Sequence, residues 1–360
     1  MKRPMVKRFL GVSLLGLLGA VILNGNGKNP YYDPAKLHHT PEGFRNNPPH
    51  VPPRSLWDVI RWQWEVRSQG LPRAAQSGYT TPRVPVDSAR LNANGHESTL
   101  TWIGHATFLL QVDGQNILTD PQFSERASPF SFIGPRRVVP PAMPLEALPH
   151  INIVVVSHDH YDHLDARTVK ALAAQTGGSP RFYVPLGLKP WFADLGIENV
   201  VELDWWSSAE FSKVQMTFVP SQHFSARRPG VQNKSLWGGW VIRGPGLNFY
   251  FAGDAAYSPD FQEIGGRLGP FDLAALPIGA YEPRWFMKGM HINPEEAVLA
   301  HRDLKARRSV AMHWGTFQLT DEALDEPPIK LAQALVEKGI PTGEFFLMRI
   351  GETRPLEPLH

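Results

Sequence analysis

The segment S-H-D-H-Y-D-H-L-D, residues 157–165, is the most informative stretch of this 360-residue chain. It places three histidines and three aspartates in positions 158–165, although the whole chain contains only 14 histidines. A His-x-His-x-Asp-His pattern is expected by chance on the order of one time in a thousand in a chain of this composition. Imidazole and carboxylate are the ligands that bind Zn²⁺ where thiolates are absent, and this chain has no cysteine. The segment therefore predicts a metal site.

Other histidine and aspartate residues follow predicted strands, as His158 does. Short apolar runs rich in β-branched and aromatic residues are typical of buried strands. Four such runs end shortly before a candidate ligand: Ile151–Val156 before His158, Val214–Val219 before His223, Asn248–Phe251 before Asp254, and Ser309–Met312 before His313. Open layered sheets bind ligands at the carboxyl ends of their strands. We therefore expect these side chains to meet at one edge of the fold.

The number of candidate ligands suits a pair of metal ions, which need about seven. The candidates are, from the first segment, His158, His160, Asp162 and His163, and, from the later strand ends, His223, Asp254 and His313. In a strand-end loop the first two histidines can turn toward one cation and the following Asp-His pair toward a second. A carboxylate such as Asp254 can bridge two cations about 3.5–4 Å apart. The predicted cofactor is two Zn²⁺ ions per chain.

The remaining pattern predicts a layered α/β (α+β) domain with mixed sheets. The turn Asp113-Gly114 joins Phe108–Val112 to Asn116–Thr119 in a predicted hairpin. Asp165 is the predicted N-cap of a helix over Ala166–Gln175. Further predicted strands are Phe182–Val184, Trp237–Ile242 and Leu273–Pro277, and further predicted helices are Pro294–Arg302 and Ile329–Glu337. Hairpins mixed with scattered helices indicate this fold class.

Several longer strings resemble one enzyme family. They are W-I-G-H-A-T at 102–107, L-T-D-P at 118–121, S-H-D-H-Y-D-H-L-D at 157–165, G-D at 253–254, L-P-I-G-A-Y-E-P-R-W-F-M at 276–287, H-I-N-P-E-E-A at 291–297 and H-W-G-T-F at 313–317. Over about residues 100–330 the chain resembles the N-acylphosphatidylethanolamine-hydrolysing phospholipase D (NAPE-PLD) family of the metallo-β-lactamase superfamily. The resemblance implies a metallo-β-lactamase-like four-layer αβ/βα sandwich with its metals at one edge.

The resemblance also implies roles for individual residues. By that match one zinc is held by His158, His160 and His223, the other by Asp162, His163 and His313, and Asp254 bridges them. His291 matches an additional active-site histidine near the substrate phosphate; the alternative is a helix-start residue beside the cap residue Asn293. Asp120 matches a family aspartate that does not bind the metal itself but orients a metal-ligating histidine. The alternative is that Asp120 is only a turn residue. His105 is interpreted as structural, and Asp159 stands where many members have asparagine.

The implied activity is that of a dinuclear zinc phosphodiesterase of the phospholipase D type. Its substrates would be N-acylphosphatidylethanolamine-like membrane phospholipids, attacked at phosphorus by a metal-activated hydroxide with release of phosphatidic acid. Catalysis would depend on Asp162, Asp254 and His291, the last bonding phosphoryl oxygens or protonating the leaving alkoxide. The same metals would also suit a lactone or a cyclic or other phosphodiester. A membrane-anchored, non-enzymatic metal-binding protein is the alternative from another class.

The N-terminal part divides into two segments ahead of the catalytic domain, which we place at 99–360. Residues 1–30 predict a signal peptide or signal anchor, because four basic residues precede the apolar run Phe9–Leu23. An exported or membrane-anchored protein is therefore expected, periplasmic or in the cell envelope if bacterial. Residues 31–98 are a Pro- and Trp-rich extension.

The extension contains one predicted helix, Ser55–Gln69, in which Leu56, Ile60 and Trp64 share a face. One interpretation places this helix at a lipid interface, with indole rings at the depth of the headgroups. The other is a helix strapped across the catalytic domain. We favour the strap.

The charge distribution bears on the partners. The net charge is +2, but residues 1–30 hold five basic and no acidic side chains, and the other 330 residues hold 31 basic and 34 acidic ones. A body with a net charge of −3 is not built to bind the phosphates of nucleic acid. The predicted partners are a phospholipid substrate and a membrane surface, and the oligomeric state stays open.

Overall fold

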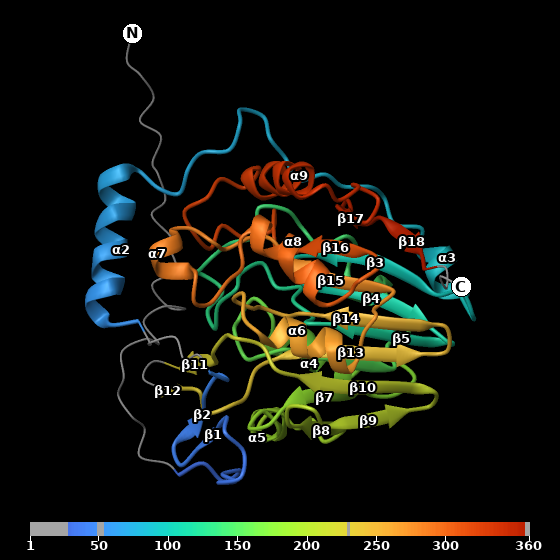
Figure 1. Cartoon of the computed structure of the whole chain (residues 1–360). Coiled ribbons are helices and arrows are strands. Elements are labelled where there is room, and N and C mark those ends of the chain that lie inside the picture. The colour runs from blue at the N-terminus through green and yellow to red at the C-terminus, as the bar shows by residue number, and fades with distance from the viewer. Residues whose placement is uncertain (1–27, 49–53, 229–230, 357–360) are drawn as a thin grey trace.

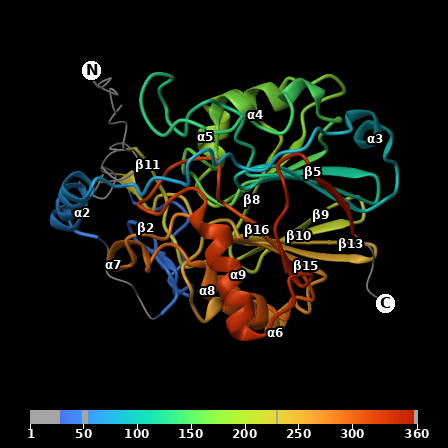
Figure 2. The same ribbon diagram turned by 90° about the horizontal axis from the view of Figure 1, so that it is seen from above.

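Two seven-stranded sheets lie face to face, with helices on both outer faces (Figures 1 and 2). The computed structural model describes residues 28–48, 54–228 and 231–356. This arrangement is the four-layer αβ/βα sandwich that the resemblance implies. The predicted fold class is therefore confirmed.

The first sheet carries the histidine-rich loop. In spatial order its strands are β18 (Thr353–Pro355), β3 (Thr99–Gly104), β4 (Thr107–Val112), β5 (Gln115–Thr119), β6 (Ile153–Val155), β7 (Arg181–Pro185) and β8 (Val200–Leu203). Strands β4 and β5 are antiparallel around Asp113-Gly114, whose positive φ angles of 48° and 72° make the predicted tight turn. Strands β5 to β8 are parallel, so β5 and β6 end at the same edge. Asp120 and His158 follow these two ends.

The second sheet delivers the other candidate ligands. In spatial order its strands are β17 (Phe345–Phe346), β16 (Ser309–Met312), β15 (Leu273–Pro277), β14 (Leu247–Phe251), β13 (Gly239–Gly244), β10 (Val214–Val219) and β9 (Ser208–Phe211). Strands β14 to β17 are parallel, and β13 is antiparallel to both β10 and β14. Strands β10, β14 and β16 therefore run in one direction and bring His223, Asp254 and His313 to one edge, as predicted.

Helices cover the two outer faces (Figure 2). Helices α4 (Ala166–Ala173) and α5 (Lys189–Ala193) lie on the first sheet, and α6 (Asp260–Arg267), α8 (Pro294–Asp303) and α9 (Glu326–Lys338) lie on the second. The main core between the sheets includes Trp102, Phe108 and Trp240, and a second core under α4 includes Val154 and Val169. Because both faces of each sheet are covered, strands such as β6 are continuously apolar rather than alternating.

Shorter elements belong to the extension and the connections. They are β1 (His39–Thr40), β2 (Gly43–Phe44), α2 (Leu56–Gln69), α3 (Ser88–Ala93), a 3₁₀ turn over Leu145–Ala147, β11 (Ala226–Arg228), β12 (Val231–Gln232) and α7 (Arg284–Met287). Helix α2 begins at Ser55, which forms a capping box with Asp58. It lies against α7 (Figure 1), where the rings of Trp62 and Phe286 stack with centroids 5.1 Å apart. The helix is thus strapped to the domain through Trp62 and Val66, and its other face is exposed.

The expectation of an exported or membrane-anchored protein requires a correction. Within residues 28–48, 54–228 and 231–356, no helix is both long and apolar enough to cross a membrane. The run Phe9–Leu23, on which the expectation was based, lies outside the described residues. Its fifteen residues are also fewer than the ~20 that a membrane-spanning helix needs.

Candidate metal centre

The histidine-rich segment forms a loop at the edge where β5, β6, β10, β14 and β16 end. A glycine allows the two sheets to meet there. Gly253, just after β14, has a φ of 60°, and a Cβ on it would lie 2.4 Å from Cβ of Ser157. Because Gly253 has no Cβ, the next residue, Asp254, can lie beside the loop. At the other end of the loop, Asp165 caps α4 by accepting a hydrogen bond from the backbone of Arg167.

Four side chains make up the first group of candidate ligands: His158, His160, His223 and Asp254. Nδ1 of His160 lies 2.8 Å from Nε2 of His158 and 3.3 Å from Nε2 of His223. Oδ2 of Asp254 lies 3.8 Å from Nε2 of His158 and of His223. Three nitrogens and one carboxylate oxygen therefore converge on one point.

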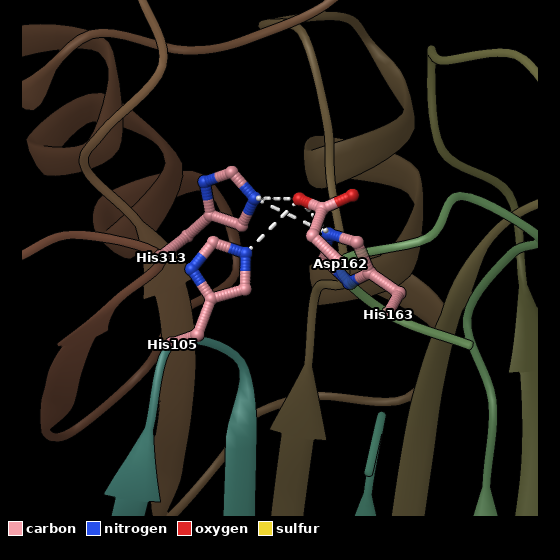
Figure 3. Close-up of side chains that lie close together, drawn as sticks. All are labelled: His105, Asp162, His163 and His313. Atoms are coloured by element: carbon pink, nitrogen blue, oxygen red, sulfur yellow. Dashed lines mark hydrogen bonds and ion pairs between the residues drawn. The ribbon is translucent and has the colours of Figure 1, made fainter. Parts of the chain in front are cut away.

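A second group contains Asp162, His163 and His313 together with His105 (Figure 3). Oδ2 of Asp162 lies 3.2 Å from Nε2 of His313 and 3.3 Å from Nε2 of His163. Asp254 reaches this group as well, because its Oδ1 lies 3.1 Å from Nε2 of His313 and its Oδ2 lies 3.1 Å from Nε2 of His163. All seven predicted ligands thus meet in one continuous cluster, with Asp254 between its two halves.

Hydrogen bonds behind the ligands decide which ring nitrogens carry protons. Asp120 is buried at the end of β5, where its Oδ2 accepts from Oγ of Ser157 at 2.6 Å and from Nδ1 of His163 at 2.7 Å. Since the Ser157 hydroxyl proton is used in this way, its oxygen accepts from Nδ1 of His158 at 2.8 Å. Nδ1 of His223 donates to the carbonyl oxygen of Met290 at 2.8 Å. A neutral imidazole has one N–H, so Nε2 of His158 and of His223 presents a lone pair to the centre, and Nε2 of His163 would do so with a metal ion in place of its proton.

The donor set fits a metal cation. Converging lone pairs without a proton between them repel unless a cation separates them, and Oδ1 of Asp254 accepts no hydrogen bond from the residues described. Burial opposes a charge on His163, but Asp254, Asp162 and Asp120 outweigh it and hold the pKa of His163 well above its usual value. The cluster therefore attracts positive charge. Neutral imidazoles with carboxylates are a metal-ligating set, so this cluster is the candidate metal centre of the chain.

His105 is a residue whose place the sequence did not reveal. It lies in the turn between β3 and β4 with a φ of 55°, and its Nε2 is 3.0 Å from Oδ2 of Asp162 (Figure 3). Its backbone N–H donates to Oγ1 of Thr316, and its carbonyl oxygen accepts from the backbone of His313. Burial, with His313 nearby, lowers the pKa of His105 to about 3. The ring is therefore neutral, and it positions Asp162 by donating a hydrogen bond.

The string W-I-G-H-A-T contained this histidine but gave no sign of its partner, which is 57 residues away in sequence. Two features of the sequence could have indicated that His105 lies near the ligands: the Gly104-His105 pair, and its place in a hairpin turn at the edge where the ligands meet. Asp159, by contrast, turns away from the centre. Its Oδ1 accepts from the backbone N–H of Ala226 at 2.9 Å and its Oδ2 accepts from Oγ of Ser235 at 3.1 Å.

A pocket opens directly over the cluster. It holds about 720 Å³ of empty space, its open mouth included. Its lining combines polar groups of the centre with apolar side chains from four segments: Ala127, Pro135, His160, Tyr161, Asp162, Phe224, Ala226, Asp254, Ala280, Met287, Met290, His291, Leu319 and Thr320. The site is therefore polar at the metal ligands and largely apolar on its walls.

His291 belongs to this lining. It lies between α7 and α8, its Nδ1 is 3.9 Å from Oδ2 of Asp254, and its ring centroid is 5.1 Å from that of His223. Nδ1 is buried and has no hydrogen-bond partner among the described parts of the chain. Asn293, two residues further on, is the N-cap of α8. His291 thus lies both beside the metal cluster and next to the start of a helix.

Comparisons with known proteins agree with this geometry. Residues 115–314 match the Beta-lactamase superfamily domain. N-acyl-phosphatidylethanolamine-hydrolyzing phospholipase D 1 of Caenorhabditis elegans is 46% identical over 285 residues, which cover 75% of this chain and 79% of the worm protein. The mitochondrial N-acyl-phosphatidylethanolamine-hydrolyzing phospholipase D of Saccharomyces cerevisiae is 35% identical over 70% of this chain and 55% of the yeast protein.

A solved structure supports the fold alone. A metallo hydrolase of the archaeon Ignicoccus hospitalis superposes with a TM-score of 0.56 at 24% identity, over 72% of this chain and 98% of the archaeal one. The architecture, the metal-ligating cluster and the relatives agree. The chain is an enzyme, a metal-dependent hydrolase, and it belongs to the N-acylphosphatidylethanolamine-hydrolysing phospholipase D family of the metallo-β-lactamase superfamily.

Proposed function

We propose that this enzyme is a dinuclear zinc phosphodiesterase of the phospholipase D type that cleaves N-acylphosphatidylethanolamine-like lipids of a membrane surface. The observation that carries the proposal is the complete ligand cluster in a chain 46% identical to the worm enzyme. Two donor groups that share Asp254 support two ions, and a donor set of imidazole nitrogen and carboxylate oxygen favours zinc.

The ligands divide between two positions. His158, His160 and His223 would hold one ion, Asp162, His163 and His313 the other, and Asp254 both. A bound zinc pair supplies Lewis acidity, which makes water more acidic and offsets negative charge on the phosphoryl oxygens. The protein keeps the ligands oriented through Asp120 and Ser157, so the donors need little rearrangement when the substrate arrives.

His291 would act on the substrate phosphate. Burial, together with His223 and His313, outweighs the effect of Asp254 and holds the pKa of His291 well below its usual value. The ring is thus neutral near pH 7, and its N–H can donate a hydrogen bond to a phosphoryl oxygen. Of the two expected roles, this structure favours hydrogen bonding over protonation of the leaving alkoxide.

The walls of the pocket suit a lipid. Met287, Met290, Phe224 and Leu319 line the space above the ligands, so an alkyl portion can lie against them while the phosphate meets the cluster. In the proposed reaction water adds to phosphorus and the P–O bond to the N-acylethanolamine breaks. The products are phosphatidic acid and the N-acylethanolamine.

The test is a substrate panel with the full-length chain. Vesicles containing N-acylphosphatidylethanolamine are compared with phosphatidylcholine vesicles, a lactone and a cyclic phosphodiester, and the products are identified by mass spectrometry. We expect hydrolysis of the N-acylated lipid that stops on chelation and returns with zinc, and about two metal ions per chain by elemental analysis. Preferred hydrolysis of the lactone or the cyclic phosphodiester would replace the proposal with another hydrolase of this fold.

A further inference from the structure

Helix α2 presents an apolar face that no described part of the chain covers. Trp57 is 77% exposed and Trp64 is 67% exposed, and Leu56 and Ile60 on the same helix are nearly half exposed. The opposite face of the same helix is fixed to the domain. Nε1 of Trp62 donates to Oδ2 of Asp321 at 2.9 Å. A helix with both faces apolar and only one of them buried has a second surface available for contact.

A second apolar surface lies on the loop 124–138. Phe132 is 78% exposed, and Phe130 and Ile133 are nearly half exposed. The loop is held in shape, because Arg126 donates to the carbonyl oxygens of Ser131 and Gly134 at 3.1 and 2.7 Å. The rings of Phe130 and Phe132, 5.6 Å apart, therefore protrude from a braced turn.

These two surfaces hold most of the exposed large apolar side chains among residues 28–48, 54–228 and 231–356. Eight of twelve belong to them: Leu56, Trp57, Ile60, Trp64, Phe130, Phe132, Ile133 and Val138. The two segments that carry these surfaces also adjoin the pocket over the metal cluster. Ala127 and Pro135 of the loop line one wall, and Met287 of α7, which packs with α2, lines another. The exposed apolar groups thus flank the entrance to the site.

The charge of the two segments is opposite in sign to that of the rest of the body. Residues 54–69 and 124–138 contain six arginines against three carboxylates, a net charge of +3, whereas residues 31–360 together have a net charge of −3. Arg61 and Arg136 are 61% and 66% exposed, although each is paired with a glutamate. Exposed tryptophan and phenylalanine beside arginine suit the boundary between acyl chains and phosphates.

We propose that α2 and the loop 124–138 together dock the enzyme on a phospholipid bilayer, with the pocket entrance facing the lipid phosphates. The inference rests on the proposed function, since a lipid substrate gives the bilayer its purpose. Trp57, Trp64 and Phe132 enter the interface, and the exposed Arg61 and Arg136 lie at the level of the phosphates. A lipid can then reach the cluster without leaving the bilayer completely.

The absence of cysteine makes a local test direct. Single cysteines are introduced in the full-length chain as Trp57→Cys, Phe132→Cys and, as the matched control, Val336→Cys on α9, where the native side chain is 80% exposed. Each is labelled with the environment-sensitive fluorophore NBD. On addition of vesicles of phosphatidylcholine and phosphatidylglycerol, we expect a blue shift and stronger emission at positions 57 and 132, quenched by nitroxide-labelled lipid. Position 336 should not change.

Two outcomes would overturn the proposal. In the first, the protein sediments with the vesicles but the emission at positions 57 and 132 stays unchanged, as at position 336. Another part of the chain would then bind the bilayer. In the second, a blue shift at position 57 or 132 appears without vesicles as the protein concentration rises. The surface would then join two copies of the chain. Weaker shifts with pure phosphatidylcholine are expected from the charge.

Activity separates this proposal from the proposed function. In the double variant Trp57→Ala/Trp64→Ala, the ratio of vesicle hydrolysis to hydrolysis of a soluble phosphodiester should fall, since the docking face and not the metal cluster has changed. An unchanged ratio contradicts docking through α2. If the native enzyme hydrolyses no N-acylated lipid, the proposed function fails, and the NBD shifts still decide whether this face enters the bilayer.

Discussion

Two clusters of histidine and aspartate among the described residues differ in their surroundings. In the metal cluster at the sheet edge, Asp120, Ser157 and Met290 accept hydrogen bonds from the outer ring nitrogens of three histidines, so the Nε2 atoms of these rings face the centre. The second cluster, Lys36, His38, His39 and Asp204, joins the N-terminal extension to the domain. Asp204 there has Nε2 of His38 at 2.7 Å, Nε2 of His39 at 3.2 Å and Nζ of Lys36 at 2.5 Å.

The second cluster supplies its own cation. Burial opposes the charge of Asp204, but hydrogen bonds from His38 and Lys36 outweigh it and hold the pKa of Asp204 well below its usual value. Both histidines turn a ring nitrogen toward its oxygens. The lysine is the difference: Lys36 neutralises the carboxylate of Asp204, whereas the ion-pair contacts of Asp162 and Asp254 come from histidines. The two clusters should respond differently to substitution.

The largest effect is expected for His160→Ala in the metal cluster, compared with His38→Ala in the other. Loss of Nδ1 removes one ligand, so activity should fall roughly 10³-fold or more and metal content should drop. His38→Ala should leave the metal content unchanged. Elemental analysis and kcat/KM measure both, with circular dichroism as the check on folding. Equal metal loss in the two variants would remove the distinction between the clusters.

The next largest effect should be on stability and come from the second cluster. Asp204→Ala leaves His38, His39 and Lys36 without their acceptor and should lower the free energy of unfolding by about 2–3 kcal/mol. This is less than for a fully buried pair, because Lys36 is 43% exposed. Urea unfolding measures the loss. A metal content that falls along with stability would mean that this cluster also binds metal.

Asp120→Asn should weaken metal binding by about 10–100-fold with little change in fold. The amide is the same size as the carboxyl group, but the two carboxylate oxygens accept from the backbone N–H and Oγ of Ser157 and from Nδ1 of His163, and the amide replaces one of these oxygens by an NH₂ donor. Competition with a chromophoric chelator measures the affinity directly. An affinity equal to that of the native chain would show that Asp120 is only a turn residue.

His105 should have a smaller effect, of about tenfold. His105→Ala removes the donor 3.0 Å from Asp162 and should weaken binding of one of the two metal ions, whereas His105→Gln can still donate and should recover part of it. Metal titration followed by calorimetry distinguishes one weakened site from two. Equal binding by the alanine and glutamine variants would show that the ring acts through packing alone.

The smallest effect concerns Asp321, a buried acid with neither lysine nor metal beside it. Burial raises the pKa of Asp321 to about 6, despite the hydrogen bond from Trp62. Because this value lies above that of the unfolded chain, the associated stability is complete below about pH 4 and is lost as the pH rises through about 6. Asp321→Asn should therefore raise the free energy of unfolding at pH 8 by about 1 kcal/mol, after allowance for solvent screening. Urea unfolding at pH 5 and pH 8 checks this, and equal changes at both would contradict it.

Much of the fold was readable from local pattern. Strands such as Val214–Val219 and Leu273–Pro277 have the predicted bounds because they are buried on both faces and are therefore continuously apolar. The helix Ala166–Gln175 ends two residues earlier than expected, at Ala173, although its N-cap Asp165 is as predicted. Helix α7 and the strands β8 and β9 were not predicted, because short half-buried elements have little periodicity.

The sequence by itself determined the ligand types and the edge at which they meet, because the side chains follow strand ends and the strand order follows from the fold class. It also determined that any metal is held by nitrogen and oxygen, since the chain has no cysteine. Only the tertiary structure decided which nitrogen of each histidine faces inward, because that depends on partners distant in sequence. Likewise, only packing showed that Trp62 is buried while Trp57 and Trp64 are exposed, because a helix with apolar residues on two faces does not specify its contact face.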